Sequence, residues 1–502
     1  MRIRLIVVAA LSVWSGLAVV PAFAQETPRV ATGQPSVAEM RARGPSDQLI
    51  VKFRERTGIR IRGGEAHNLA GADRDGLAGV LAAAGLTFAD FRRLHARPEA
   101  ELDVERAEAQ RESRRGLADL NLYYRLRVPN GVDAVALAEQ LGRLPVVEFA
   151  EPAGSPPPPP GDIPPDTPQL KKFQGYRKAG DGVGTLKAKG GKGKGISVVD
   201  VEYNWNLGHE DLDLPASANI DKETLVDPFP ADEGNHGTAV LGQIGGLKND
   251  YGVEGLAAGA KIMVAPTVTV QSGFSVARAI GVATGKLKKG DAILIEQQAP
   301  VCGGTCGASQ VGCGPVEYAQ AEFDAISTAT AKGIIVVEAA GNGSVNLDSG
   351  SCKGRFDRKV RDSGAIIVGA GDFDTHERLF FSTFGKRVDV QGWGNAITTA
   401  GYGDAFDPGD ILQRYTHTFG GTSGASPIVT GVVLQIQGAL KAQGLKLAKP
   451  EEMRKALRKG GIKQPTTSEP IGPLPQTQKA YEWMLKKRGV SPNAPDMVAA
   501  AE

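Results

Sequence analysis

Short apolar segments alternate with helical patterns through the second half of the chain. Five segments have the length and composition of buried strands: residues 196–199, 261–266, 292–295, 334–338 and 365–368. Apolar residues at helical spacing occupy residues 238–244, 275–287, 316–332 and 426–442. Strands that are apolar throughout need cover on both faces, and intervening helices allow parallel connections. This half is therefore predicted to have an α/β fold with a mostly parallel central sheet and helices on both faces.

A proline-rich stretch separates this half from the N-terminal part. Residues 155–160 have the sequence SPPPPP, and Pro164, Pro165 and Pro168 follow. Such a run favours an extended polyproline II conformation and does not enter a packed core. Glycine content also changes here, because 14 of the 65 glycines lie in the first 160 residues and 51 in the remaining 342. The two parts are therefore predicted to be separate domains.

The N-terminal part is predicted to contain a small α+β domain of residues 47–152. Strand patterns cover residues 48–53, 122–128 and 146–149, and a helical pattern covers residues 135–144. Residues 98–115 are highly charged, which predicts an exposed helix or an insertion. Residues 26–46 are rich in Pro, Ser, Gly and Arg and are expected to be a flexible lead-in to this domain.

The first 25 residues have the layout of a secretory signal peptide. Arg2 and Arg4 precede a mostly apolar run over residues 5–20, and Ala22 and Ala24 occupy the positions that signal peptidase reads. The alternative is an uncleaved membrane anchor, but the run is short for a spanning helix, which needs about 20 residues. We therefore expect cleavage after Ala24 and a secreted protein, extracellular or periplasmic, with no membrane anchor.

Export determines how the four cysteines are interpreted. Cys302, Cys306, Cys313 and Cys352 are an even number in an oxidising compartment, which predicts two disulfides. Three pairings are possible, and the sequence does not choose among them. A zinc site is the alternative, although the spacings match no standard zinc pattern.

The charge balance gives no reason to expect a nucleic-acid partner. The chain has 58 Lys and Arg against 56 Asp and Glu, a net charge of +2. The one basic stretch, residues 187–195, has neither a phosphate-loop pattern nor aromatic neighbours, and a solvated turn is expected there.

Three polar residues stand where catalytic groups gather in a parallel α/β fold. Asp200 ends an apolar strand segment, His236 opens a helical segment in GNHGTAV, and Ser423 begins a long apolar helix in GGTSGASP. A serine hydroxyl needs a base within hydrogen-bond reach, and that base needs a carboxylate to orient it. The order Asp, His, Ser along the chain is one of the known orders of such triads.

The sequence resembles the subtilisin-like serine peptidases, or subtilases. GTSGASP at residues 421–427 is similar to the family segment around the nucleophile, and HGT at 236–238 is similar to its histidine segment. VVD at 198–200, followed by HEDL at 209–212, resembles its aspartate segment, and AAGNG at 339–343 resembles its oxyanion segment. The resemblance covers about residues 170–480 and implies a subtilisin-like three-layer sandwich. It also implies a serine endopeptidase that cleaves polypeptides through an acyl-enzyme, with Asp200, His236 and Ser423 as its triad.

The resemblance also assigns residues around the triad. Asn342 and the backbone N–H of Ser423 would hold the oxyanion. Substrate would bind along the segment that replaces the family's S-L-G strand and beside the AAGN segment, at Gln297, Gln298, Ala299, Ala340 and Gly341.

A structural Ca²⁺ is a further implication of the resemblance. Residues 247–253 (LKNDYGV) are similar to the family's calcium loop, with ligands at alternate positions and one carboxylate from the HEDL segment. The implied ligands are Asp211, Leu247, Asn249, Tyr251 and Val253. Oxygen ligands with few charges suit Ca²⁺. The alternative is an ordinary Asn/Asp/Gly turn.

The resemblance assigns the N-terminal part as a propeptide that assists folding and inhibits the enzyme until its removal. A permanent accessory domain is the alternative. The expected division is a signal peptide at 1–24, a propeptide comprising the lead-in and the α+β domain at 25–152, a linker at 153–170, a catalytic domain at 171–484 and a tail at 485–502.

The chain departs from the family pattern in ways that put substrate preference in doubt. Asp200 is followed by Val201 and Glu202, where the family has a small hydroxyl residue and glycine. Glu296 and Glu338 are expected at the ends of neighbouring strands, either as acids that favour basic substrate side chains or as parts of a local structural network.

Two other functions are alternatives to a peptidase. A catalytically silent binding protein conflicts with the filled triad positions, and an α/β-hydrolase esterase conflicts with the absence of G-x-S-x-G around Ser423.

Overall fold

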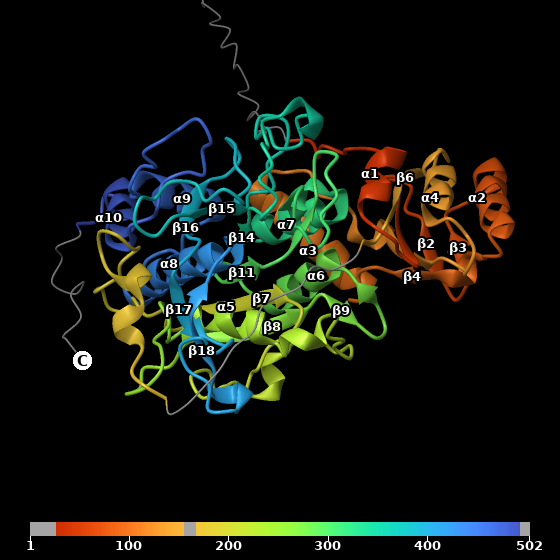
Figure 1. Cartoon of the computed structure of the whole chain (residues 1–502). Helices are drawn as coiled ribbons and strands as arrows, with labels where there is room; N and C mark the ends of the chain where they lie inside the picture. Colours follow the sequence, from red (N-terminus) through yellow and green to blue (C-terminus); the bar gives the residue numbers. More distant parts are fainter. Residues whose placement is uncertain (1–26, 155–166, 492–502) are drawn as a thin grey trace, which may run out of the picture.

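The computed structural model describes residues 27–154 and 167–491. The predicted signal peptide, most of the proline-rich linker and the end of the tail lie outside these residues. The described residues form an N-terminal domain (27–154), built on an antiparallel sheet, and a parallel-sheet domain (167–491) (Figure 1).

The parallel-sheet domain is organised around six strands in the order β16-β15-β14-β11-β7-β8. All neighbouring pairs are parallel. The strands are β7 (Ser197–Glu202), β8 (Lys261–Pro266), β11 (Ala292–Ile295), β14 (Ile335–Ala339), β15 (Ile366–Gly371) and β16 (Val390–Trp393). Five of them match the predicted segments, so the parallel sheet is confirmed. The edge strand β16, with the sequence VQGW, was not predicted, because it is short and lacks an apolar run.

Helices cover both faces of this sheet. On one face lie α6 (Val276–Lys286) and α7 (Gln320–Ala331), and on the other lie α5 (Asn235–Gly245) and α8 (Thr422–Ala442). The two-residue period of the strands divides their side chains between these layers. In β7, Val198 packs with α5 and α8, whereas Val199 and Val201 pack with α6 and α7. The predicted three-layer α/β sandwich is therefore confirmed.

The remaining elements complete the parallel-sheet domain. Helices α9 (Pro450–Lys459) and α10 (Thr477–Lys487) pack beside α8. The predicted boundary between residues 484 and 485 is wrong, because it would divide α10, and Met484 and Leu485 are buried. Short strands form three hairpin pairs: β9 (Val268–Thr269) with β10 (Gly273–Phe274), β12 (Gln298–Pro300) with β13 (Cys313–Pro315), and β17 (Ile397–Ala400) with β18 (Tyr415–Phe419).

The N-terminal domain has four antiparallel strands in the order β4-β5-β1-β6. The strands are β1 (Gln48–Phe53), β4 (Phe91–Arg93), β5 (Tyr123–Arg127) and β6 (Val147–Pro152), with a small hairpin of β2 (Arg60–Arg62) and β3 (Glu65–His67). Its helices are α1 (Val37–Ala42), α2 (Gly71–Ala83), α3 (Glu99–Ser113) and α4 (Ala134–Gly142). The predicted α+β domain is present, and the charged segment at 98–115 forms α3.

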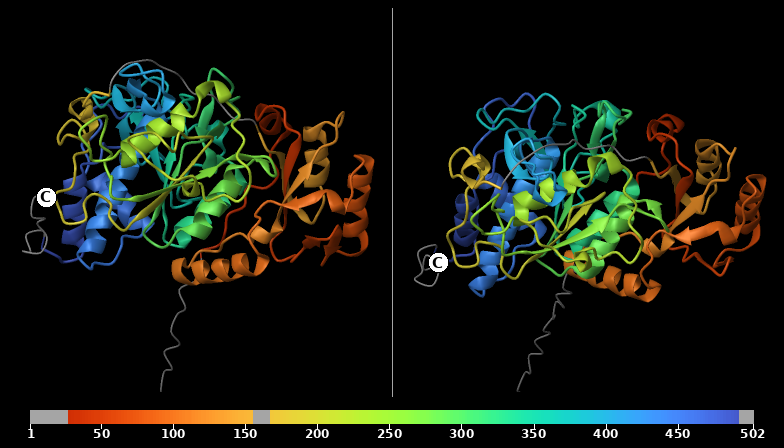
Figure 2. Two further views of the ribbon diagram at one scale, coloured as in Figure 1. Left: turned by 90° about the horizontal axis from the view of Figure 1, so that it is seen from below. Right: turned by 60° about the horizontal axis from the view of Figure 1, so that its bottom comes forward.

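The two faces of the antiparallel sheet pack against different partners. One face, with Val51 and Leu126, packs on α1, α2 and α4. The other face, with Ile50, Tyr123 and Phe149, packs on α6 and α7 of the parallel-sheet domain. Figure 2 shows the N-terminal domain, in red to orange, against that side of the molecule. The interface is therefore a continuous apolar core shared by both domains.

Buried charges also cross this interface. Arg29 Nη2 lies 2.7 Å from Asp324 Oδ2 on α7 and 2.6 Å from Glu148 Oε1 on β6. The Tyr123 hydroxyl also donates to Asp324. Burial alone would raise the pKa of Asp324, but the Arg29 charge and hydrogen bonds lower it. Asp324 is therefore held as a buried anion by residues of the N-terminal domain.

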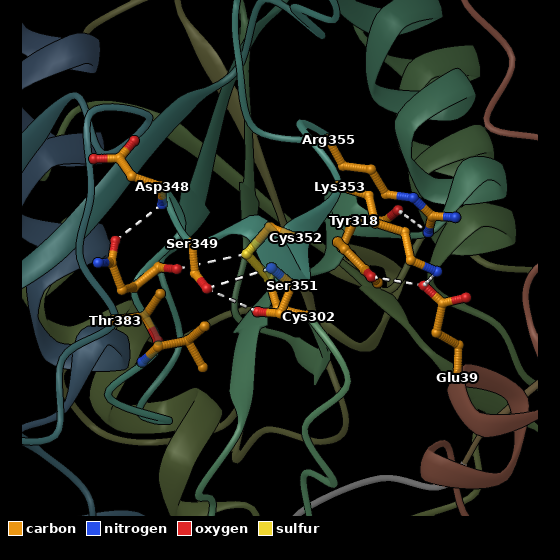
Figure 3. The surroundings of a disulfide bond; sticks show 12 residues. Glu39, Cys302, Tyr318, Asp348, Ser349, Ser351, Cys352, Lys353, Arg355 and Thr383 are labelled. Atoms are coloured by element: carbon orange, nitrogen blue, oxygen red, sulfur yellow. Dashed lines mark hydrogen bonds and ion pairs between the residues drawn. A yellow bond between two sulfur atoms is a disulfide. The ribbon is translucent and has the colours of Figure 1, made fainter.

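The prediction of a flexible lead-in is wrong for the part that the structure describes. This segment contains Arg29 and α1, which begins with a capping box between Ser36 and Glu39. Glu39 then reaches the parallel-sheet domain, where Tyr318 donates to it at 3.0 Å and Lys353 at 3.2 Å (Figure 3). The S-x-x-E spacing is a helix-start signal that the composition obscured.

All four cysteines form disulfides, Cys302 with Cys352 and Cys306 with Cys313. The zinc alternative is therefore excluded. Cys302–Cys352 joins the loop after β12 to the turn that follows Asn346 (Figure 3), and Cys306–Cys313 closes a loop immediately before β13. Across residues 27–154 and 167–491, no helix combines the length and the apolar character needed to cross a bilayer.

Candidate active site

The carboxyl edge of the parallel sheet and the starts of two helices surround a small pocket. Glu202 ends β7, His236 lies in the first turn of α5, Asn342 follows β14, and Ser423 lies in the first turn of α8. The pocket encloses about 50 Å³. It is lined by Glu202, Tyr203, His236, Glu296, Gln297, Gln298, Gln310, Ala339, Asn342, Thr422 and Ser423. The structure therefore brings the predicted nucleophile, base and oxyanion residue together.

The carboxylate that pairs with His236 is Glu202, and the prediction of Asp200 is wrong. His236 Nδ1 lies 2.6 Å from Glu202 Oε2. Asp200 instead accepts a hydrogen bond of 2.7 Å from the indole nitrogen of Trp205. Its other oxygen has no hydrogen-bond partner among the described residues.

The difference follows from where β7 ends. Asp200 and Glu202 are two residues apart and therefore point to the same face of the strand, but Glu202 lies farther along by about 6.6 Å. Catalytic groups of a parallel sheet lie at its carboxyl edge, and Glu202 is the last residue of β7. The carboxylate is held there by Tyr203 N–H at 2.8 Å and by Gln297 Nε2 at 3.1 Å.

Burial and neighbouring charges shift the pKa values of Asp200 and His236. Burial, and after it the negative charge of Glu202, raise the pKa of Asp200 well above its usual range. Burial alone would lower the pKa of His236, but the charge and hydrogen bond of Glu202, with a smaller contribution from Asp232, raise it. Glu202 thus stabilises the protonated imidazole, as the orienting carboxylate of a triad must.

Ser423 is placed by the start of α8. Gly421 precedes the helix with φ +81°, a conformation that glycine adopts without strain. The first N–H groups of a helix have no intrahelical partner, so the N–H of Ser423 is free to donate to a ligand. Glu296 lies beside the serine and accepts a hydrogen bond of 2.5 Å from Ser426 in the same helix. Burial raises the pKa of Glu296 well above its usual range.

The hypothesis of a substrate-binding acid is not supported for Glu338. Its Oε1 accepts the Glu317 N–H at 2.9 Å, and it is fully buried outside the pocket. Glu317 in turn pairs with Arg387 at 2.7 Å. Glu338 therefore belongs to a local structural network. Glu296 does line the pocket, but its carboxyl is bound to Ser426.

Asn342 is oriented by hydrogen bonds on both sides of its side-chain amide. Its Oδ1 accepts from the N–H and the hydroxyl of Thr422, both at 2.9 Å. Its Nδ2 is thereby turned into the pocket, where it donates to Gln310 Oε1 at 2.9 Å. A side-chain amide that donates beside the nucleophile is the arrangement that an oxyanion hole requires.

Only some of the predicted substrate-binding residues line the pocket. Gln297 and Gln298 do, and Ala339 lines it in place of Ala340. Ala340 is buried, and the backbone of Gly341 packs closely against Gly314. Ala299 pairs with Gly314 across the β12–β13 hairpin. Gln310 and Tyr203 were missed, because neither belongs to a recognisable motif.

The residues of the predicted calcium site do meet. Asp211 is fully buried, and its two carboxylate oxygens accept from Asn249 Nδ2 at 2.5 Å and from Val253 N–H at 2.6 Å. The N–H of Leu247 donates to the backbone oxygen of Asp211. Burial raises the pKa of Asp211 to about 6, and no basic side chain pairs with it in the described structure. Both carboxylate oxygens are therefore met by N–H donors, and a hard cation at this carboxylate would need the Asn249 amide turned so that its oxygen faces Asp211.

Comparisons with known proteins show the family of the chain. The model described as "Subtilase family" matches residues 191–469, more than half of the chain, and this match includes Glu202, His236, Asn342 and Ser423. M-protease of Shouchella clausii (strain KSM-K16) is 26% identical over 249 residues, which cover 50% of this chain and 56% of M-protease. Subtilisin Savinase of Lederbergia lenta is 26% identical over 249 residues, which cover 50% of this chain and 78% of that protein.

A solved structure shares the fold. Fervidolysin from Fervidobacterium pennivorans, a keratinolytic enzyme related to subtilisin, aligns with a TM-score of 0.55 and 18% identity, over 91% of this chain and 63% of that one. The matched region spans little more than half the length of M-protease. The family match, the parallel sheet and the placement of His236 and Ser423 lead to one conclusion: the chain belongs to the subtilase family.

Proposed function

We propose that the chain is a serine endopeptidase that is exported through a signal peptide at residues 1–24 and made as a zymogen. The observation that supports this most strongly is the 2.6 Å bond between His236 and Glu202, in a pocket that Ser423 and Asn342 also line. Those residue types supply a nucleophile, a general base, an orienting carboxylate and an oxyanion donor.

The reaction follows from these positions. Ser423 Oγ attacks the carbonyl carbon of a peptide bond, and His236 Nε2 takes the hydroxyl proton while Glu202 stabilises the resulting imidazolium. The Asn342 amide and the Ser423 N–H hold the oxyanion. When the intermediate collapses, the C–N bond breaks and His236 gives its proton to the leaving amine. A water molecule then repeats the sequence on the acyl-enzyme.

A serine-directed phosphonylating reagent tests this proposal. One equivalent bound per chain should abolish casein hydrolysis, because the reagent forms a bond to an activated serine oxygen. Casein hydrolysis that survives full phosphonylation, or a chain with no hydrolytic activity before treatment, would refute the proposed function.

The N-terminal domain is proposed to be the inhibitory propeptide. Its sheet contacts α6 and α7 through an apolar face, and Arg29 is tied to Asp324 by buried ion pairs. After β6, Gly154 lies against Phe274 of β10, so the segment leaves this domain beside the parallel-sheet domain. An extensive interface of this kind can hold the two parts together after the connecting chain is cut.

Acidification should weaken this interface through His95. His95 is 3% exposed, and burial, with the charges of Arg93 and Arg97, lowers its pKa to about 3. In the separated domain the pKa returns toward 6.5, so binding is strongest above pH 6.5 and is lost as pH falls toward 3. Between pH 7.5 and 5.5 the expected contribution of His95 is about a tenfold loss of affinity.

The matched control is His95→Gln, which is neutral at every pH. Burial and the charge of Glu151 raise the pKa of Glu322 to about 7, and this group opposes the trend because its stabilisation is lost as pH rises. The effect of Glu322 is the same in wild type and in His95→Gln. The ratio of wild-type to His95→Gln dissociation constants, measured by inhibition with the separate N-terminal domain, should therefore rise about tenfold from pH 7.5 to 5.5. A constant ratio would contradict the prediction.

Ca²⁺ is proposed as a structural ion at Asp211. The carboxylate of Asp211, the side-chain oxygen of Asn249 and the carbonyl oxygens of Leu247, Tyr251 and Val253 would hold it. The ion, when bound, supplies positive charge to a buried carboxyl whose pKa burial raises to about 6. In the structure this carboxyl accepts from the Asn249 side-chain amide and the Val253 N–H, so binding of the ion would turn the Asn249 amide.

Thermal unfolding tests the ion. At a Ca²⁺ concentration about 100 times the dissociation constant, binding adds about 2.7 kcal/mol, and Tm at pH 7.5 should rise by about 5 °C. EDTA should reverse the rise. Asp211→Asn should abolish it, whereas Asp213→Asn, which changes an exposed neighbour, should retain it. Equal responses of the two variants would contradict the site.

A further inference from the structure

The side chain of Gln310 occupies the part of the pocket toward which two amides point. Its Oε1 accepts from Asn342 Nδ2 at 2.9 Å and from Gln298 Nε2 at 3.1 Å. All three residues line the pocket that Ser423 and His236 share. A carbonyl oxygen of the protein therefore lies next to the nucleophile, between two hydrogen-bond donors.

The hydrogen bonds around it determine which atoms are donors. Gln298 Oε1 accepts the backbone N–H of Asn342 at 2.9 Å, so its Nε2 is the end left for the pocket. Asn342 Oδ1 accepts twice from Thr422, so its Nδ2 is likewise the free end. An amide nitrogen of Gln310 could not accept from either group. The atom between them must be a carbonyl oxygen.

The loop that carries Gln310 is closed by the Cys306–Cys313 disulfide. Gln310 has φ +58°, its N–H donates to Gly307, and its carbonyl oxygen accepts from Cys313 N–H. The left-handed conformation is uncommon for a residue other than glycine. It directs the side chain out of the tight loop and into the pocket. Chemically, the end of this side chain is an amide like the peptide bond that the enzyme would cleave.

We propose that Gln298 is a further catalytic residue, whose side-chain amide donates to the oxyanion together with Asn342 and the Ser423 N–H. This inference rests on the proposed peptidase function. Gln310 Oε1 marks the position of the substrate carbonyl oxygen, and substrate displaces Gln310 when it binds. As Ser423 Oγ bonds to the carbonyl carbon, the C=O electron pair moves to this oxygen and the serine proton moves to His236. When the tetrahedral intermediate collapses, this electron pair re-forms the C=O bond, the C–N bond breaks, and His236 gives the proton to the leaving amine.

The variant Gln298→Glu removes the hydrogen-bond donor of this side chain and keeps the rest of its shape. Glutamate keeps the oxygen that accepts the Asn342 N–H, but it replaces the donating Nε2 with an acceptor. The loss of one oxyanion donor lowers kcat about 10²- to 10³-fold, and a donor that acts mainly in the transition state leaves KM within a few-fold of wild type. Asn342→Ala is the positive control, with a loss of the same order.

Two further measurements test the oxyanion contact of Gln298 and its competition with Gln310. A peptide aldehyde forms a hemiacetal with Ser423 and should bind Gln298→Glu about 10²- to 10³-fold more weakly. Gln310→Ala removes the competing carbonyl and should lower both KM and the aldehyde inhibition constant several-fold. Each full-length variant is processed by a trace of wild type, and Gln298→Met provides a neutral variant of similar size if glutamate lowers Tm.

The outcomes separate this inference from the proposed function. If wild type hydrolyses peptides and Asn342→Ala is impaired, but Gln298→Glu and Gln298→Met keep kcat within threefold, the role of Gln298 is refuted and the peptidase assignment stands. A higher KM with an unchanged kcat would also refute the role of Gln298. A wild-type chain without activity would overturn both.

Discussion

Replacing Glu202 with glutamine should lower kcat about 10³- to 10⁴-fold, because the amide cannot stabilise the protonated His236. Glutamine has nearly the same shape, and its nitrogen would favour the wrong tautomer of the imidazole. The ratio of kcat values is measured by the hydrolysis of a peptide p-nitroanilide. Wild type and Glu202→Gln are compared after removal of the N-terminal domain. KM should change little, since the Glu202 carboxylate is occupied by hydrogen bonds to His236, Tyr203 and Gln297.

Asp200→Asn is the matched control for this substitution. Asp200 accepts a hydrogen bond from Trp205 and not from His236, and burial raises its pKa, so the neutral amide should cost less than about tenfold in kcat. If Asp200→Asn causes the larger loss and Glu202→Gln the smaller, the assignment of the acid is wrong. Comparable unfolding temperatures of both variants would show that the difference lies in the reaction and not in the fold.

Ser423→Ala should cause a still larger loss, about 10⁵- to 10⁶-fold in kcat, because it removes the oxygen that forms the acyl-enzyme. The residual rate comes from the oxyanion donors and from substrate binding, which the substitution leaves intact. Active-site titration with a burst substrate should show one equivalent of acyl-enzyme in wild type and none in the variant.

Ser426→Ala is the control for a serine in the same motif. Ser426 donates to Glu296 and to the Thr422 carbonyl, and it is buried below the pocket. Its removal should preserve the acyl-enzyme burst. A burst in Ser423→Ala, or its disappearance only in Ser426→Ala, would contradict the assignment of the nucleophile.

The sequence allowed the prediction of those parts of the site that lie in contiguous motifs. His236, Asn342 and Ser423 each stand in a short segment whose residues also build the turn that places them, so local sequence and function coincide. The parallel sheet was predictable for the same reason, since its strands are apolar runs. The strand β16 and the helix α1 were missed, because β16 is not apolar throughout and α1 lies in a segment whose composition is that of a linker.

The carboxylate that pairs with His236 was mispredicted because this pairing depends on the end of a strand. Asp200 and Glu202 have the same orientation in β7, and only the length of the strand decides which of them reaches the carboxyl edge. The position of Gln310 in the pocket could not be predicted, for a different reason. Its position depends on the Cys306–Cys313 disulfide and on a left-handed backbone, and neither can be read from the residues around it.

The proton on His236 Nδ1 reports whether Glu202 orients His236. In full-length Ser423→Ala, a proton in a 2.6 Å bond to a carboxylate should give a one-proton NMR resonance far downfield of the backbone amides. If Glu202 accepts this proton, adding Asp200→Asn should retain the resonance and adding Glu202→Gln should remove it. A resonance that survives Glu202→Gln but disappears with Asp200→Asn would show that Asp200, and not Glu202, orients His236.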